Sequence, residues 1–593
     1  MVRLMMKSFR LYFLAATCFA LTSCVADRLA FWRDDALLKP YQVEGLEDSL
    51  ETQTYISSII QSRQGDLEIS KDDDPAQMYS YHQENLRRDI AKAMRAKGFY
   101  DAQVSYVDAD DHGTFMIDAG KRSVLSSLSI SPDKYQNYMD GLVLKAGDPL
   151  DAVNILAAQK KIYNAIEKDS CSAGLKVSHK ARLNTQTHQS AVIFIVEQGK
   201  PAIFGAVSFD GMEHVKTEFL HKVVKWKEGA CFKRNEVDKA KEKLIGTGLF
   251  SRVDVILPEN LNRGGNVPVS FVLKERAERT VKAGLSYYTD EGVRLSAGWE
   301  HRNFFGSGEK LNADLALSVQ EQSIKGALSK PYFLRDDQSL NFRTMLERKD
   351  TDAFEEFGLS TGFNIKRQFN KRLSAGLGAD VSLTRITDEG EEAQNFGLLS
   401  PIADILYDSR DNTLDPHKGW LLSSSVQPFM DILGETSPFF KTKASAQSYY
   451  ALHDDVVLAG RFKFGSIFGT DTQDLPATER FFAGGGGSVR GFAYQEVGPF
   501  KDGDPEGGRS LAEGSLELRY KFTDTLGMVA FVDAGHVGDQ IVPTFSDMAV
   551  GAGLGARYYT DFGPLRFDVG VPVSGDENTD QKFQVYISIG QAF

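Results

Sequence analysis

The second half of this chain alternates between apolar and polar residues with a period of two, beginning at about residue 279. An early run sets Val281, Leu285 and Tyr287 against polar or small neighbours, and the final run does the same with Phe583 and Ile587. Successive side chains of a β-strand point to opposite faces, so each run predicts a strand with one apolar and one polar face. A soluble β-sandwich produces the same alternation, so the pattern alone does not separate the two folds.

A targeting segment at the N-terminus, long polar loops and the aromatic Phe593 favour a transmembrane β-barrel over a sandwich, and the composition favours a barrel over a soluble helical enzyme. Aromatic residues make up 11% of the chain and glycines number 53, as expected of a wall with aromatic rims and a polar lumen. Strands in lipid must close on themselves, because an open edge would leave backbone amides unpaired. At about 20 residues for each strand and its turn, residues 279–593 supply about 16 antiparallel strands. Closure requires Val281–Tyr288 to pair with Phe583–Phe593.

The N-terminus is typical of a targeting segment. Basic residues at its start precede the apolar stretch Leu11–Leu21, which predicts a signal peptide over residues 1–26. Two interpretations of its end remain open. Leu21-Thr22-Ser23-Cys24 resembles a lipobox, which would make Cys24 a lipidated residue, whereas cleavage after Ala26 would make Cys24 incidental. Beyond residue 26 no run of 18 or more apolar residues occurs.

Two cysteines, Cys171 and Cys231, lie outside the targeting segment. In an exported and oxidising setting they are candidates for a disulfide that would close a loop of about 60 residues. The alternative is a pair of separate buried thiols, which a Cα separation beyond about 7 Å would require.

Residues 38–276 repeat one pattern three times: a helix, a break that contains glycine, and a strand. The predicted helices are Asn85–Ala96, Ala157–Ile166 and Glu236–Ile245, and the middle copy is the weakest. Glycine ends helices in general, so one such break is not evidence for a repeat. The evidence is the recurrence of the whole pattern at intervals of about 75–80 residues, a length that suits a small α+β domain. We therefore expect α+β domains at 38–122, 123–199 and 200–276.

A glycine-rich stretch, FFAGGGGSVRGF at residues 481–492, interrupts the strands. Glycines let a loop turn sharply and approach a wall without Cβ clashes, and Arg490 behind them is a forked, permanently charged donor. On the strand around Asp533, Met528 and Val532 occupy the apolar, outward parity, so Asp533 points inward. A loop of this kind is able to enter a lumen and bring Arg490 to a carboxylate on the inner wall. The alternative is a surface loop with a solvated arginine.

Enzymatic, metal-dependent and nucleic-acid-binding functions are disfavoured. The formal net charge of −13 lacks the basic footprint of a nucleic-acid binder. Ser360 sits in a G-x-S-x-G match, but its flanks alternate straight through as a strand, whereas a nucleophile elbow needs a helix behind it. The closest histidines, His214 and His221, lack the spacing of a metal site. We expect no enzyme activity, no metal and no cofactor.

Several phrases resemble the BamA/TamA, or bacterial surface antigen, superfamily. They are RNFFGSGEKL (302–311), DSRD (408–411), PHKGW (416–420), GPLRFD (563–568), FVDAG (531–535) and VRGF, that is Val489, Arg490, Gly491 and Phe492. The resemblance implies that VRGF is the tip of a lumenal loop whose partner is Asp533. The three repeats resemble POTRA domains, and three of them before a barrel is similar to the TamA-like layout.

The resemblance also implies a function and a location. It implies an outer-membrane protein of a Gram-negative bacterium, with periplasmic POTRA domains, that assembles β-barrel proteins or autotransporters. The implied partners are unfolded outer-membrane clients, outer-membrane lipid and a TamB-like partner in the inner membrane. The seam between the first and last strands would act as a lateral gate, with Val281, Leu285, Phe583, Ile587, Gly590 and Phe593 on its strands. The alternatives are a two-partner-secretion-type exporter, a BamA-like general insertase, and a plain channel or adhesin.

Overall fold

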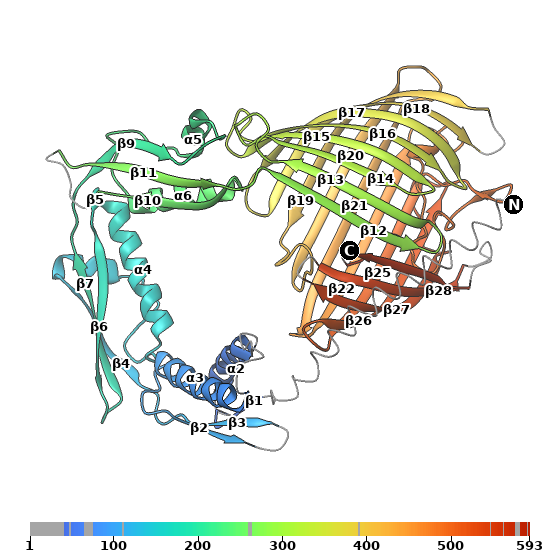
Figure 1. Cartoon of the computed structure of the whole chain (residues 1–593). Coiled ribbons are helices and arrows are strands. Elements are labelled where there is room, and N and C mark those ends of the chain that lie inside the picture. The colour runs from blue at the N-terminus through green and yellow to red at the C-terminus, as the bar shows by residue number, and fades with distance from the viewer. Residues whose placement is uncertain are drawn as a thin grey trace. The chain divides into compact units, whose positions relative to one another are not determined.

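The computed structural model describes residues 41–46, 49–64, 75–108, 112–258, 264–388, 392–545, 547–560, 563–575, 582–589 and 591–593. Three α+β modules occupy the first part of the chain and a closed β-barrel the second part (Figure 1). The predicted signal peptide with Cys24, and Gly590 of the last strand, lie outside the described residues. Among the described helices, none is long and apolar enough to span a membrane.

Each module builds a three-stranded sheet. The first module has the sheet order β1-β3-β2 and contains β1 (Tyr41–Glu44), α2 (Leu50–Gln64), α3 (Pro75–Ala96), β2 (Gln103–Asp108) and β3 (Gly113–Asp118). The second has the order β4-β7-β6 and contains β4 (Val124–Ser131), the 3₁₀ helix η2 (Asp133–Met139), α4 (Ala152–Asp169), β6 (Lys176–Asn184) and β7 (Gln189–Glu197). The third has the order β10-β11-β9 and contains β9 (Ile203–Asp210), α5 (Thr217–Val223), α6 (Arg234–Gly246), β10 (Phe250–Ile256) and β11 (Asn266–Glu275). A short ribbon of β5 (Ser172–Ala173) and β8 (Lys200–Pro201) follows α4.

The module helices follow from the apolar pattern of the sequence. The stripe expected on α3 is buried, with Leu86, Ile90 and Met94 each at most 1% exposed. Recurrence every three to four residues puts these side chains on one face of the helix, which packs against the sheet. The helix α4 is longer than the predicted Ala157–Ile166, because the Asp151 carboxylate accepts the Val153 amide hydrogen bond at 2.8 Å and caps the helix earlier.

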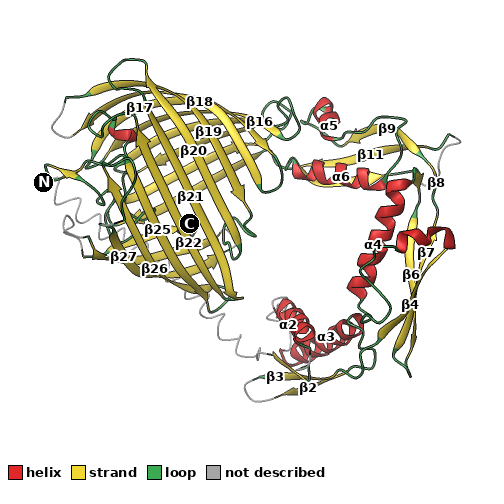
Figure 2. Ribbon diagram, turned by 180° about the vertical axis from the view of Figure 1, so that it is seen from behind, coloured by secondary structure: helices red, strands yellow, loops and turns green. Residues whose placement is uncertain are grey.

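In the described part of the chain, sixteen antiparallel strands close into the barrel, which confirms the predicted count. Figure 2 shows these strands around the barrel wall. They are β12 (Arg279–Tyr288), β13 (Gly292–His301), β14 (Lys310–Leu317), β15 (Glu321–Lys330), β16 (Gln338–Asp350), β17 (Phe354–Gln368), β18 (Leu373–Asp388), β19 (Gln394–Asp408), β20 (Gly419–Asp431), β21 (Phe439–His453), β22 (Val456–Phe468), β25 (Ser510–Lys521), β26 (Leu526–Gly538), β27 (Ala549–Thr560), β28 (Gly563–Ser574) and β29 (Gln584–Ile589). We name the end at which β12 begins the proximal end, and the opposite one the distal end.

The two faces of the barrel wall differ as the alternation predicts. On β26 the outward Val532 is 49% exposed, whereas its neighbour Asp533 is fully buried on the inner side. Outward Val281 of β12 is 76% exposed. An apolar outer face and a polar inner face suit a wall that lies in lipid and encloses a polar lumen.

Candidate functional site

A long loop, residues 469–509, folds from the distal end into the lumen. It joins β22 to β25 and includes the 3₁₀ turn η3 (Ala477–Glu479) and the small hairpin of β23 (Phe500–Lys501) and β24 (Asp504–Pro505). Its tip is buried, with Val489, Arg490 and Phe492 each at most 1% exposed. The turns into and out of the tip use Gly484 and Gly491, whose φ angles of +108° and +104° disfavour any residue with a Cβ.

Arg490 binds Asp533 through three hydrogen bonds. Its Nε donates to Oδ2 at 2.6 Å, its Nη2 to Oδ1 at 3.0 Å, and its backbone N–H to Oδ2 at 3.1 Å. The guanidinium plane also lies 3.5 Å from the centre of the Phe531 ring. This is the bidentate geometry in which arginine–carboxylate pairs are strongest, so the loop tip is held in one position against β26.

Two further carboxylates complete the site: Glu517, which the sequence analysis did not name, and Asp568, which ends the GPLRFD phrase but was given no role there. Nη1 of Arg490 donates to Glu517 at 2.7 Å and to Asp568 at 3.1 Å. Both carboxylates are fully buried. Arg519 and Arg557 bind them in turn, so the cluster contains cations and anions in similar numbers. Charges removed from water are tolerated only when they are paired in this way.

The loop tip also contacts the last strand of the barrel. The Gly491 amide donates to the hydroxyl of Tyr586 at 3.1 Å, and that hydroxyl donates to the Phe492 carbonyl at 3.3 Å. Tyr586 lies on β29 and is fully buried. The loop is thus bonded to both β26 and β29, the strand that closes the barrel.

The seam between β12 and β29 is short. It contains two paired positions in the described residues, Tyr287 with Ile587 and Tyr288 with Tyr586, whereas β12 pairs with β13 at ten positions. The predicted pairing of Val281–Tyr288 with Phe583–Phe593 is therefore wrong in its extent. Strand β29 starts after Phe583 and ends at Ile589, and Phe593 lies inside the lumen, where Arg519 donates to its carbonyl at 3.0 Å.

A cavity of about 830 Å³ lies between the loop and the inner wall. Its lining includes the lysines Lys366, Lys443 and Lys463 and the carboxylates of Asp404 and Glu513. The loop therefore does not fill the lumen, and the cavity that remains is lined by these charged residues together with apolar ones such as Phe464, Phe481 and Phe482.

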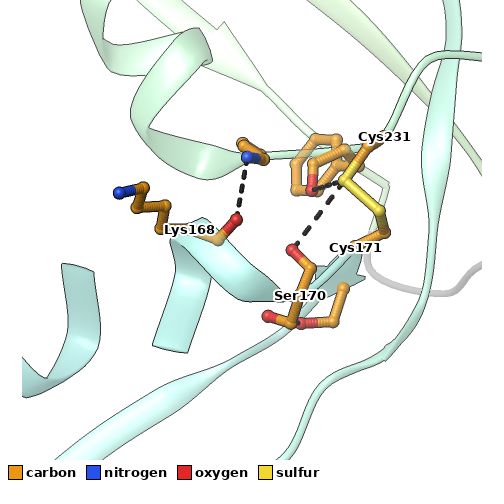
Figure 3. Close-up of a disulfide and its surroundings, with 7 residues drawn as sticks. Lys168, Ser170, Cys171 and Cys231 are labelled. Atoms are coloured by element: carbon orange, nitrogen blue, oxygen red, sulfur yellow. Dashed lines mark hydrogen bonds between the residues drawn. A yellow bond between two sulfur atoms is a disulfide. The ribbon is translucent and has the colours of Figure 1, made fainter. Parts of the chain in front are cut away.

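Cys171 and Cys231 form a disulfide with a Cα separation of 5.0 Å (Figure 3). Beside it, the Lys233 ammonium donates to the Lys168 carbonyl at 3.0 Å. The buried Glu167 carboxylate accepts the amide N–H of Asn235 at 2.9 Å, at the first turn of α6. The second and third modules are thus joined by a covalent bond and by a carboxylate at a helix N-terminus, where negative charge is favourable.

The rejected enzyme and metal motifs have ordinary structural roles. Ser360 lies in the middle of β17, opposite Met345 of β16. His214 binds Glu275, while the His221 ring packs edge-on against Phe209. Among the described residues, no cluster of three or more His, Cys, Asp or Glu side chains is arranged to hold a metal.

Two known families match parts of this chain, one in each half. The family described as Omp85 superfamily domain matches residues 303–593, and the POTRA family, described as surface antigen variable number repeat, matches residues 202–276.

Two relatives share the name outer membrane protein assembly factor BamA. One, from Nitratidesulfovibrio vulgaris, is 22% identical over 84% of this chain and 66% of its own length. The other, from Neisseria meningitidis serogroup B, is 23% identical over 75% of this chain and 63% of its own length. The chain thus spans slightly less than two thirds of the length of either relative.

A solved structure shares the fold. The crystal structure of BamA from Haemophilus ducreyi lacking POTRA domains 1–3 has a TM-score of 0.66 and 18% identity, and the match covers 79% of this chain and all of that one.

Proposed function

Since this chain belongs to the Omp85 superfamily, we propose that it assembles β-barrel proteins in the bacterial outer membrane. Its barrel lies in that membrane and its POTRA modules lie in the periplasm. Unfolded outer-membrane proteins are the clients, and no covalent chemistry takes part. The finer proposal is a TamA-like member that serves autotransporters and works with a TamB-like inner-membrane partner. It rests on the sequence resemblance and on three modules before the barrel in the described residues.

The observation that carries the proposal is the short seam. Residues Val281–Ser286 of β12 have no β29 partner within the described part of the chain. A strand edge with free backbone groups is a template for another strand. A client strand can therefore add to this edge by β-augmentation, as extended peptides do at other exposed sheet edges. Opening the barrel at this seam breaks two paired positions, whereas opening it between β12 and β13 would break ten. Sideways opening at the seam therefore costs less free energy.

The lumenal loop supports the gate by bracing the wall next to it. Arg490 fixes the tip to Asp533, and Gly491 and Phe492 bond to Tyr586 on β29. The strand on one side of the seam is thereby tied to the loop, whereas β12, within the described residues, is bonded to β29 only at its distal end, through the pairs at Tyr287 and Tyr288 and the hydrogen bonds between Thr289 and Val585. The gate would open by movement of β12 with β29 held in place.

A cysteine pair across the seam tests the proposal. We expect Tyr287→Cys with Ile587→Cys, which are directly opposite, to crosslink when oxidised and to abolish insertion of a client barrel into vesicles. Reduction should restore insertion. The matched control is Phe567→Cys with Ile587→Cys, a pair within the wall between β28 and β29, which should leave insertion intact. Full insertion by the seam-crosslinked protein would reject a lateral gate and favour passage of the client through the lumen, as in an exporter.

A further inference from the structure

Two arginines and a phenylalanine form a row on the outer face of the barrel, near its distal end, and we call them the arginine row. Arg348 of β16 is directly opposite Phe357 of β17, and Phe357 is directly opposite Arg385 of β18. These three strands are consecutive neighbours in the barrel wall (Figure 1). Because paired strands lie about 4.8 Å apart, the backbones of the two arginines are about 10 Å apart. Both guanidiniums can therefore reach one ligand in front of Phe357.

The arginine row faces the lipid side of the wall. Leu346, Leu359 and Leu383 form the next row towards the proximal end, two residues along the same strands, and all three are exposed. Side chains two positions apart share one face of a strand, so the arginine row lies on the same side as these leucines. All members of the arginine row are themselves exposed.

The arginine row lies at the level of a membrane interface. Phe357 and Arg367 are ten residues apart on β17, and the outward positions between them hold no charge. At the usual rise and tilt of a barrel strand this stretch spans about 25 Å, which is the height of the apolar band of such barrels. Since β12 follows the periplasmic modules at the proximal end, the distal arginine row lies in the outer leaflet.

Positive charge on the lipid side of the distal half is confined to this row. In the strands as the structure describes them, the other outward lysines and arginines lie at the proximal end, namely Arg279, Lys330 and Arg367. A charge that faces lipid is costly at the midplane and tolerated near an interface. Two arginines on one short arc of the rim therefore indicate a local site, not a general belt of interfacial cations.

The protein leaves both cations available to a ligand. The Arg385 guanidinium makes no ion pair or hydrogen bond with the described residues. Arg348 Nη2 lies 3.6 Å from Asp350 Oδ2, which is too far for a hydrogen bond, and both side chains are exposed, so this pair contributes little. Asp350 and Glu355 are opposite each other one step beyond the row, away from the bilayer. They do not separate the arginines from a lipid headgroup.

We propose that the arginine row is a binding site for a phosphorylated lipid of the outer leaflet. Arginine binds phosphate oxygens through parallel, charge-assisted hydrogen bonds. Arg348 and Arg385 hold the phosphate groups, Phe357 lies between them at headgroup depth, and the leucine row contacts the acyl chains. The site begins four strands from β12, so it does not depend on the proposed gate. A lipid bound there anchors the wall on a side away from the seam.

Native mass spectrometry of the full-length protein in detergent micelles tests the site, with diphosphorylated lipid A as the probe. Arg348→Gln with Arg385→Gln should weaken binding about tenfold, because the charge-assisted hydrogen bonds to phosphate are lost. The matched control is Lys330→Gln with Arg367→Gln, which removes two outward cations from the proximal end and should leave the affinity unchanged. The same lipid without its phosphates should bind the wild type and the arginine variant equally.

Three results would overturn the proposal. One is equal affinity of the wild type and the arginine variant for lipid A. Another is an equal loss in the proximal control, which would mean attraction by net charge alone. The third is displacement of the lipid by an equal concentration of inorganic phosphate, which would mean a site for free phosphate. Folding of each variant is checked by its heat-dependent mobility in gels, and Arg348→Gln and Arg385→Gln should each lower the affinity singly. None of these results bears on the lateral gate.

Discussion

Gly551 on β27 lies directly under the backbone carbonyl of Arg490, so close that a Cβ at this position would overlap the oxygen. The loop can reach the wall only because the side chain is absent there. Gly551→Ala should push the loop tip off the wall at a cost of about 1–3 kcal/mol, the usual range for overpacking. We expect faster proteolysis of residues 469–509 and weaker client insertion. Gly514→Ala on β25 is the matched control, because a Cβ there meets nothing within 4 Å.

Removing the arginine should release the same loop by a different route. Arg490→Ala leaves Asp533, Glu517 and Asp568 without a shared cation, which predicts a loss of about 3–5 kcal/mol in loop docking. Client insertion should fall sharply while the barrel keeps its heat-dependent mobility. Arg490→Lys should recover little, because one ammonium cannot replace the forked contacts to several carboxylates. Insertion at the normal rate by Arg490→Ala would show that the loop does not brace the gate.

The Arg490–Asp533 contact was predictable because the VRGF and FVDAG phrases resemble the superfamily's, and the parity of the strand agrees by pointing Asp533 inward. The two other carboxylates, Glu517 and Asp568, share the inward parity of their strands. Their meeting with Arg490 depends on the stagger between strands, which the alternation does not determine. The predicted pairing of Phe593 was wrong for a related reason. Its parity fits an outward strand residue, whereas the Arg461 and Arg519 guanidiniums that contact its ring in the lumen come from strands distant in sequence.

The disulfide should stabilise the modules and leave the barrel unaffected. Closing a loop with a sequence separation of 60 residues between Cys171 and Cys231 is worth about 4 kcal/mol in the chain-entropy account. Cys171→Ser with Cys231→Ser should therefore lower the urea midpoint of the module transition, measured by circular dichroism. The barrel transition should not move. Dithiothreitol should shift the wild-type protein in the same way and have no effect on the double variant.

Acid should weaken the third module through Glu275. Burial favours the neutral carboxyl, but hydrogen bonds from the backbone amides of Val215, His214 and Glu213 and from the His214 ring outweigh it, and the pKa of Glu275 is lowered. A carboxylate with a lowered pKa stabilises the fold above its unfolded value, about 4.3, and this contribution is lost as pH falls through the folded pKa. The module transition should thus shift to lower urea below about pH 4.

His214, the partner of Glu275, should make the stability of the third module fall as pH rises, which is the opposite dependence at higher pH. The hydrogen bond to Glu275, with the charge of Glu278, raises the pKa of His214. Its contribution is complete below the unfolded pKa of about 6.5 and is lost as pH rises through the folded value. Glu275→Gln should remove the acid limb and weaken the upper one, since a neutral amide does not titrate and leaves only the charges of Glu278 and Glu213 to attract the imidazolium. Glu242→Gln on the exposed side of α6 is the control. Urea midpoints between pH 3 and pH 9 check this, and a Glu275→Gln profile parallel to that of the wild type would mean that other groups govern the pH response.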